Sequence, residues 1–204
     1  MKNFSKLTSG LIAVAFFSIA SLSASAQQFA SRVSRASTLP PASTISTLYS
    51  NDPIAHTLCF TDGREGGVFQ DGQARNRCSH IDFDTYKASN LSVGIEGGEL
   101  GAIIDLGNAQ DLQANQYQAF SGIRFVDGKI LLIKDPKKDE RQELPRAAQV
   151  FAAGNDMSSA EAKPGHIYLA RITDRHNKDF QILVKLLVLS VRPGELVTFR
   201  WELL

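Results

Sequence analysis

Apolar and polar residues alternate most regularly near the C-terminal end of the sequence. Residues 197–203 (VTFRWEL) alternate strictly, which is typical of a strand with one buried and one exposed face. Residues 180–189 (FQILVKLLVL) are almost continuously apolar, as in a central strand covered on both faces. Residues 166–172 (HIYLARI) form a third run, and short polar turns separate the three. The pattern predicts a three-stranded antiparallel meander.

The strict alternation also assigns the single tryptophan to the core. Trp201 shares its predicted face with Phe199 and Leu203, and large aromatic residues in such a pattern are usually buried. The alternative is an exposed aromatic platform for a sugar ring, formed by Trp201, Tyr168 and Tyr86. We expect the core position because the neighbours on that face are all apolar.

Shorter apolar runs earlier in the chain predict further strands. The pair Asp127-Gly128 lies between two such runs and is a strong hairpin signal, because both residues tolerate the positive φ angles of a tight turn. Residues 91–95 and 101–107 flank a glycine-rich turn and predict a second hairpin.

Many short strands and no long amphipathic helix predict a mainly β fold, either an antiparallel β-sandwich or a β-barrel. Residues 108–118 and 144–151 are compatible with short helices, and Pro145 suits the first turn of a helix. A β-rich α+β fold is therefore the alternative.

Residues 1–26 have the pattern of an export signal. Lys2 and Lys6 precede an apolar stretch, and Ala24-Ser25-Ala26 supplies the small residues that a signal peptidase reads. The strongly apolar part, residues 11–22, is shorter than the about 20 residues that span a bilayer. We therefore predict cleavage after Ala26 and no stable membrane span in the mature chain.

The remaining sequence divides into two parts. Residues 27–50 are rich in Ser, Thr and Ala around Pro40-Pro41, and we expect an extended or disordered lead. Residues 51–204 are expected to form a single β-rich domain. The export signal predicts that the mature protein is secreted and lies in a periplasmic or extracellular space.

The compartment decides how the two cysteines are interpreted. Thiols outside the cytosol tend to oxidise, so Cys59 and Cys78 are predicted to form one disulfide. In the chain-entropy model, closing this loop of about 20 residues stabilises the fold by roughly 3 kcal/mol.

The charge balance excludes one class of partner. The chain has 22 Lys+Arg and 21 Asp+Glu, and removing Lys2 and Lys6 with the signal changes the net charge from +1 to −1. Nucleic-acid-binding surfaces are strongly basic, so we expect no nucleic-acid partner. A protein or a glycan remains as the expected partner.

His80, Asp82 and Asp84 are weak candidates for a metal site. Alternation of residues 79–86 places all three on one strand face, which we expect to meet solvent. Alternate residues of a strand lie about 6.6–7 Å apart, too far to converge on one ion without a bend or further ligands. We therefore predict no metal and no cofactor.

Glu96, Glu99 and Asp105 suggest an enzymatic alternative. They lie in and beside the second predicted hairpin, and paired carboxylates hydrolyse glycosidic bonds. Exposed acids are common near turns, however, and no known catalytic motif occurs in the sequence. We predict no catalytic residue.

Residues 60–64 (FTDGR) and 79–83 (SHIDF) have a strand–turn–strand pattern, and residues 165–171 (GHIYLAR), continuing to Lys185, have a strand, a charged turn and a returning strand. These segments resemble exported bacterial β-rich proteins of unassigned function. The resemblance implies the same compartment and fold class, and it brings no catalytic residues with it.

The leading hypothesis is a non-enzymatic exported β-domain with a binding or structural role in the cell envelope or the extracellular space. The alternative is a small carbohydrate-active or other hydrolytic domain that uses the carboxylates near residues 96–105.

Overall fold

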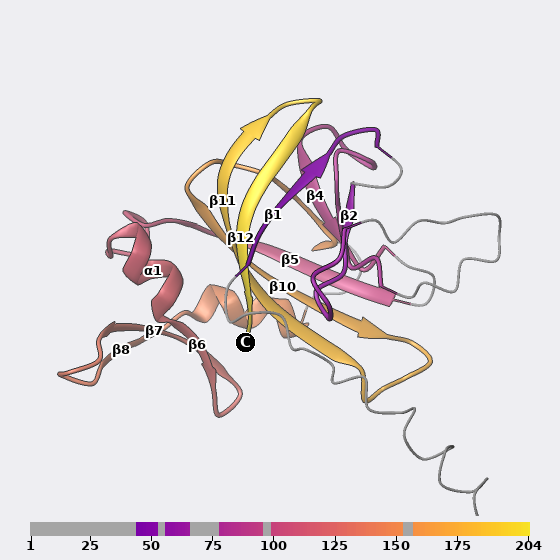
Figure 1. Ribbon diagram of the computed structural model, residues 1–204. Helices are drawn as coiled ribbons and strands as arrows, with labels where there is room; N and C mark the ends of the chain where they lie inside the picture. The colour runs from indigo at the N-terminus through magenta and orange to yellow at the C-terminus, as the bar shows by residue number, and fades with distance from the viewer. Residues whose placement is uncertain (1–43, 53–55, 66–77, 96–98, 153–156) are drawn as a thin grey trace, which may run out of the picture. The chain divides into compact units, whose positions relative to one another are not determined.

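The computed structural model describes residues 44–52, 56–65, 78–95, 99–152 and 157–204 (Figure 1). Their strands form three antiparallel sheets, which confirms the mainly β fold. None of these sheets closes into a barrel over the described ranges. The predicted signal peptide, residues 1–26, lies outside them.

The largest sheet has five strands in the order β1-β12-β11-β10-β5. They are β1 (Thr44–Tyr49), β12 (Leu196–Leu203), β11 (Gln181–Arg192), β10 (His166–Asp174) and β5 (Glu99–Asn108). The adjacent strands β10, β11 and β12 are the predicted meander, which is confirmed. Residues 183–188 of β11 are all buried, as expected for a central strand.

Strand β1 belongs to this sheet although the sequence placed it in the lead. It pairs with β12 from Thr44 opposite Trp201 to Tyr49 opposite Leu196. Alternation explains the pairing, because Ser46 and Leu48 are buried while Ile45 and Tyr49 are exposed. The end of the predicted lead, residues 27–50, is therefore a sheet strand, and the rest of that lead lies outside the described residues.

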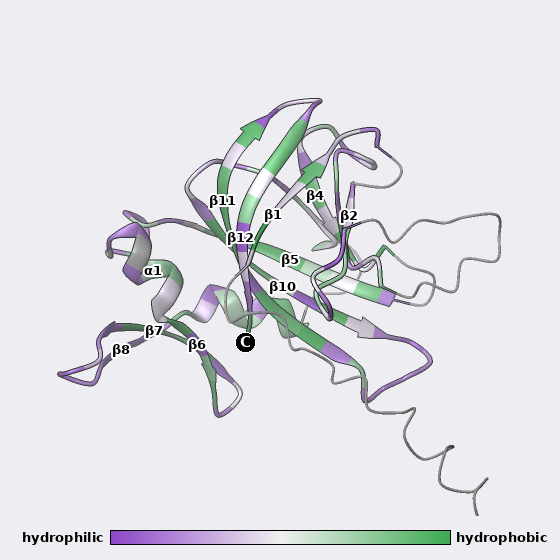
Figure 2. Ribbon diagram, viewed as in Figure 1, coloured by the Kyte–Doolittle hydropathy of each residue, from purple (hydrophilic) through white to green (hydrophobic). Residues whose placement is uncertain are grey.

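A second sheet has the order β2-β3-β4-β9, with β2 (Thr57–Leu58), β3 (Ile81–Phe83), β4 (Asn90–Val93) and β9 (Ser159–Glu161). Its buried residues form one hydrophobic core with those of the five-stranded sheet. Figure 2 shows apolar residues, in green, along β5, β10, β11 and β12 of the larger sheet. Trp201 lies in this core with 1% of its surface exposed, so the predicted core position is confirmed. Its ring packs edge-on against Phe60, with ring centroids 5.2 Å apart, and its Nε1 donates a hydrogen bond to Ser46 Oγ.

The predicted hairpin between residues 91–95 and 101–107 is wrong. Strand β4 pairs with β3 and β9, whereas β5 pairs with β10 in the other sheet. The chain passes from one sheet to the other where the backbones of Gly94 and Gly101 touch, and a Cβ atom on either residue would overlap the other strand. A glycine-rich segment suits both this crossing and a hairpin turn, so the glycines alone do not distinguish the two.

The third sheet contains β6 (Ile123–Val126), β7 (Lys129–Asp135) and β8 (Glu140–Glu143). The predicted hairpin at Asp127-Gly128 is confirmed, with φ angles of 49° and 77° at these two residues.

The helices are short. Helix α1 (Gln116–Gly122) begins after Asn115, whose side chain accepts a hydrogen bond from the Gln118 N–H. The 3-10 helix η1 (Pro145–Ala148) and helix α2 (Gln149–Ala152) follow one another, and Pro145 opens the first as predicted. Across the described ranges, no helix has the length and apolar character needed to cross a membrane.

Candidate functional site

Buried polar side chains concentrate on one side of the molecule's core. All of those described, apart from Ser46 and Lys185, lie in or beside the four-stranded sheet and the start of β5. They are Thr57, Ser79, His80, Asp82, Asn90, Ser92 and Glu99. The expectation that the His80 and Asp82 face meets solvent is wrong, because these residues are 0% and 2% exposed. Both faces of β3 are covered.

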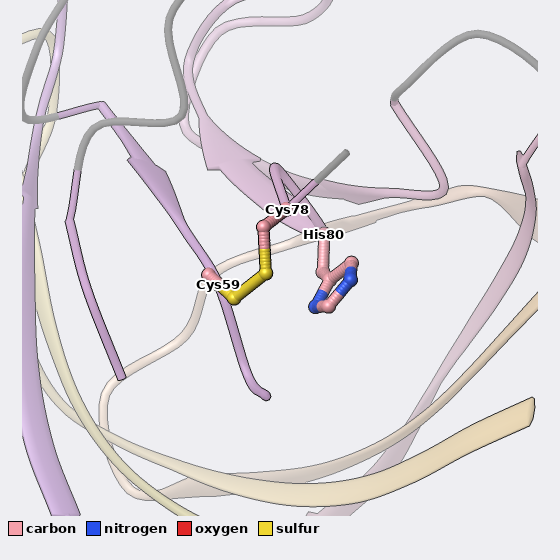
Figure 3. Close-up of side chains that lie close together, drawn as sticks. All are labelled: Cys59, Cys78 and His80. Atoms are coloured by element: carbon pink, nitrogen blue, oxygen red, sulfur yellow. A yellow bond between two sulfur atoms is a disulfide. The ribbon is translucent and has the colours of Figure 1, made fainter. Parts of the chain in front are cut away.

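The predicted disulfide between Cys59 and Cys78 is present (Figure 3). It joins the residue after β2 to a residue shortly before β3, with the two Cα atoms 4.8 Å apart. A turn follows Cys59, in which its N–H donates to the Arg64 carbonyl and its own carbonyl accepts from the Gly63 N–H. The bond therefore fixes the start of the four-stranded sheet covalently.

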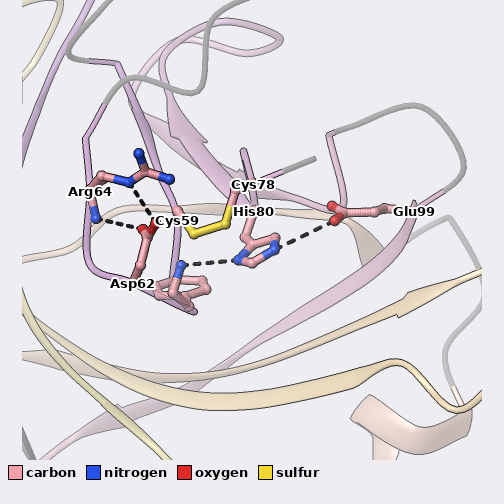
Figure 4. The surroundings of a disulfide bond; sticks show 7 residues. Cys59, Asp62, Arg64, Cys78, His80 and Glu99 are labelled. Atoms are coloured by element: carbon pink, nitrogen blue, oxygen red, sulfur yellow. Dashed lines mark hydrogen bonds and ion pairs between the residues drawn. A yellow bond between two sulfur atoms is a disulfide. The ribbon is translucent and has the colours of Figure 1, made fainter. Parts of the chain in front are cut away.

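His80 connects this disulfide region to β5. Its Nδ1 accepts a hydrogen bond of 3.0 Å from the Phe60 N–H, so the ring proton is on Nε2 when the ring is neutral (Figure 4). Burial lowers the pKa of His80 to about 4, although the charge of Asp62 opposes the shift. The neutral ring directs Nε2 toward Glu99, whose Oε1 is 3.6 Å away.

Asp82 and Asp84 have separate surroundings. Burial raises the pKa of Asp82 to about 6, while Thr85, His56 and Ser92 act in the opposite direction. The Asp84 carboxylate accepts hydrogen bonds of 2.6 Å from Ser50 Oγ and from the Ser89 N–H.

The three weak metal candidates therefore do not assemble into one site. Within the described ranges, a different trio, Cys59, Cys78 and His80, has its ligand atoms within 4.8 Å of one another.

A cavity of about 280 Å³ opens beside the polar cluster. We call it the β4–β5–β9 cavity, because residues of these strands and of the segments next to them line it. Its polar lining consists of Tyr86, Ser92, Glu99, Ser158, Ser159 and Arg175. The backbones of Gly94 and Gly101 complete one wall, where the chain crosses between sheets. Tyr86 is 67% exposed, whereas Ser92 is buried.

The predicted carboxylates are not brought together. Glu99 lines the cavity, and Glu96 lies outside the described residues. Asp105 lies six positions along β5 from Glu99, which corresponds to about 20 Å in an extended strand. Its carboxylate contacts His166 Nδ1 at 3.0 Å and accepts a hydrogen bond from the Gly107 N–H.

The aromatic platform does not form either, since Tyr168 and Trp201 are buried and Tyr86 alone of the three is exposed.

Several cavity residues carry no local signal in the sequence. Ser92 interrupts an apolar run, and Ser158, Ser159 and Arg175 come from turns and a short strand without a motif. Only the pairing of β4 with β9 brings the serines next to β5. Contacts between distant segments, rather than local patterns, create this cavity.

One more buried ionisable residue, Lys185, does not line the cavity. Lys185 is 0% exposed, and burial lowers its pKa to about 8 despite the nearby Glu202 carboxylate. Its Nζ donates to the Ile123 carbonyl, lies 3.3 Å from Glu202 Oε2 and sits 4.8 Å from the Phe120 ring centroid. These contacts satisfy the ammonium group within the fold.

No family model, curated protein or solved structure matches this chain. The resemblance to exported bacterial β-rich proteins remains a prediction from the sequence.

Proposed function

We propose that this chain is an exported, non-enzymatic binding domain that holds a small hydroxylated ligand, such as one sugar unit of a glycan, in the β4–β5–β9 cavity. The observation that carries the proposal is the cavity lining, which combines serine hydroxyls, one carboxylate and one guanidinium beside an exposed tyrosine ring. The disulfide agrees with an exported protein.

The chemistry of the lining favours a ligand rich in hydroxyl groups. Serine hydroxyls both donate and accept hydrogen bonds, a carboxylate accepts them, and a guanidinium donates them. Together they match the hydroxyl groups of a ligand, each of which can donate and accept a hydrogen bond. The exposed Tyr86 ring offers an apolar face of the kind on which a sugar ring stacks.

The cavity volume suits a small ligand. At about 280 Å³, it lies just below the range of about 300–1,000 Å³ that is usual for pockets of drug-sized molecules. One sugar unit is a better match than a longer chain, although the rest of a glycan can extend into solvent.

The hydrolytic alternative has weaker support. A glycosidase needs two carboxyl groups about 5–9.5 Å apart that flank one bond. Among the described lining residues, Glu99 is the single acid, and Asp82, which is 2% exposed, does not line the cavity. A role in binding needs no second acid.

The proposal is tested by screening the purified protein against a panel of mono- and oligosaccharides with ligand-observed NMR. We expect Tyr86→Ala to raise the dissociation constant of a bound sugar at least about tenfold, because the sugar loses the aromatic ring on which it stacks and the surface that this contact buries. Tyr49→Ala is the matched control, because Tyr49 is 44% exposed on β1 and does not line the cavity.

A panel without any bound sugar, or equal affinity for the Tyr86→Ala and unaltered proteins, would contradict the proposal. Release of new reducing ends from an oligosaccharide would favour the hydrolytic alternative, and Glu99→Gln should then abolish the release.

A further inference from the structure

We propose that Cys59, Cys78 and His80 form a Zn²⁺ site when their disulfide is reduced, with the two thiolates and His80 Nδ1 as ligands. The two cysteine sulfur atoms, here joined in the disulfide, and a ring nitrogen of His80 already lie within 4.8 Å of one another (Figure 3). This proposal does not depend on the ligand of the β4–β5–β9 cavity.

The distances suit a tetrahedral ion. Zn–S bonds of about 2.3 Å and Zn–N bonds of about 2.0–2.1 Å place neighbouring ligand atoms about 3.5–3.8 Å apart. The Cα atoms of Cys59 and Cys78 are 4.8 Å apart, so the two sulfurs stay close when the bond between them opens. Pairing of β2 with β3 keeps His80 beside them, since its N–H donates to the Leu58 carbonyl.

His80 is in the form that a metal requires. Its Nδ1 accepts a hydrogen bond from the Phe60 N–H, so this nitrogen carries the lone pair that a metal ligand needs. The opposite nitrogen, Nε2, faces Glu99 (Figure 4). Metal-binding histidines commonly direct their second nitrogen at a carboxylate, which orients the ring and increases its basicity.

Zn²⁺ binding requires one rearrangement in this geometry. The Phe60 N–H now donates to Nδ1, and a metal ion would take that lone pair. The gain from two thiolate bonds is expected to exceed the loss of one hydrogen bond.

The disulfide and the metal site exclude each other. A dithiol reductant transfers two electrons and two protons, so that its own thiols become a disulfide while Cys59 and Cys78 become thiols. Cys78 is the sulfur open to attack, since it is partly exposed and Cys59 is buried. Zn²⁺ then displaces both thiol protons, which are released to solvent.

Two thiolates and one imidazole select among metals. Soft and borderline ions such as Zn²⁺ prefer this set, whereas Ca²⁺ and Mg²⁺ prefer oxygen ligands. Three protein ligands leave a fourth position for water.

The test uses the full protein, reduced with a phosphine under an inert atmosphere and titrated with Co²⁺ as a coloured substitute for Zn²⁺. We expect one Co²⁺ per chain, a sulfur-to-cobalt charge-transfer band and the visible bands of a tetrahedral ion. Added Zn²⁺ should displace the Co²⁺, and the oxidised protein should show none of these bands.

His80→Gln separates the proposed site from two thiols that bind a metal by themselves. We expect it to weaken Co²⁺ binding at least about tenfold and to alter the visible bands. His176→Gln is the matched control, because His176 is an exposed turn residue. As a second measurement, Zn²⁺ should raise the melting temperature of the reduced unaltered protein and not that of the reduced His80→Gln protein.

The proposal is overturned if the reduced protein shows no charge-transfer band. It is also overturned if His80→Gln and His176→Gln bind Co²⁺ with equal affinity and identical spectra.

Discussion

The five-stranded and four-stranded sheets share one core but bury different chemistry. The five-stranded sheet is built from long strands, such as the 12 residues of β11, and its buried side chains are apolar apart from Ser46, Lys185 and, at the start of β5, Glu99. The strands of the four-stranded sheet contain two to four residues, and several of their buried side chains are polar.

The difference shows how apolar and polar burial are distributed between the two sheets. Burying apolar surface stabilises a fold, whereas burying carboxyl and imidazole groups opposes folding unless they find partners. The apolar core of the five-stranded sheet therefore offsets the cost of burying His80 and Asp82 in the four-stranded sheet, beside Glu99 of β5.

The largest expected effect comes from removing the main aromatic residue of the five-stranded sheet. Trp201→Ala should lower the free energy of unfolding by about 3–5 kcal/mol, because it leaves a cavity in the shared core. Urea denaturation followed by circular dichroism measures this loss.

Leu203→Ala on the same strand is the control, since Leu203 is 36% exposed. It should cost about 1 kcal/mol or less. Equal losses for the two variants would mean that the core is not centred on Trp201.

The crossing between the sheets gives the next largest effect. Gly94→Ala should destabilise the fold by about 2–4 kcal/mol, because the new Cβ overlaps Gly101 and because Gly94 has a φ angle of 69°. Gly194→Ala tests the backbone angle alone, since Gly194 has a φ of 72° and open space around it.

Only about 1–2 kcal/mol is expected for Gly194→Ala. Melting curves of both variants measure the two losses of stability. If Gly94→Ala destabilised the protein no more than Gly194→Ala, the backbones at Gly94 and Gly101 would be able to move apart.

The polar cluster predicts two pH dependences of opposite sign. The pKa of Asp82 is raised to about 6, so this group stabilises the fold at low pH and loses its contribution as pH rises from about 4 to 6. The pKa of His80 is lowered to about 4, so this group destabilises the fold as pH falls from about 6.5 to 4. In the unaltered protein, these two opposite changes of the free energy of unfolding with pH should largely cancel.

Single variants separate these slopes. Asp82→Asn should make the protein less stable toward pH 4, and His80→Gln should make it less stable toward pH 6, each by on the order of 2–3 kcal/mol over the window. Urea denaturation from pH 4 to pH 7 measures both. Slopes of the same sign in the two variants would contradict the assignment.

The smallest expected effect concerns Lys185, the buried cation of the five-stranded sheet. Lys185→Met should change the free energy of unfolding by about 1 kcal/mol or less, since an apolar side chain avoids the cost of burying an ammonium group. The measurement is again urea denaturation at pH 7, with Leu186→Ala as the control that should cost about 2–5 kcal/mol. A large loss for Lys185→Met would show that the buried cation is needed for folding.

The two sheets also differ in how well local sequence patterns predict them. The alternation around Trp201 and the turn residues Asp127-Gly128 identified the meander and a hairpin, because strand faces and tight turns depend on neighbouring residues. The disulfide followed from compartment and cysteine count.

The candidate site was less predictable, because it depends on which strands pair. The short polar strand β9 covers the edge of β4, and Glu99 reaches His80 from the other sheet. These contacts buried His80 and Asp82, whose alternation alone indicated a solvent-facing surface. Local patterns also could not distinguish a hairpin from the crossing at Gly94.

The pairing of β1 with β12 has a consequence for the order of events during synthesis. Residues 44–49 leave the ribosome early, yet their partner in the sheet, residues 196–203, is made more than a hundred residues later. Until then, β1 has no strand to bind, and the core around Trp201 lacks its largest side chain. The β1 edge of the five-stranded sheet therefore cannot form before residues 196–203 have been synthesised.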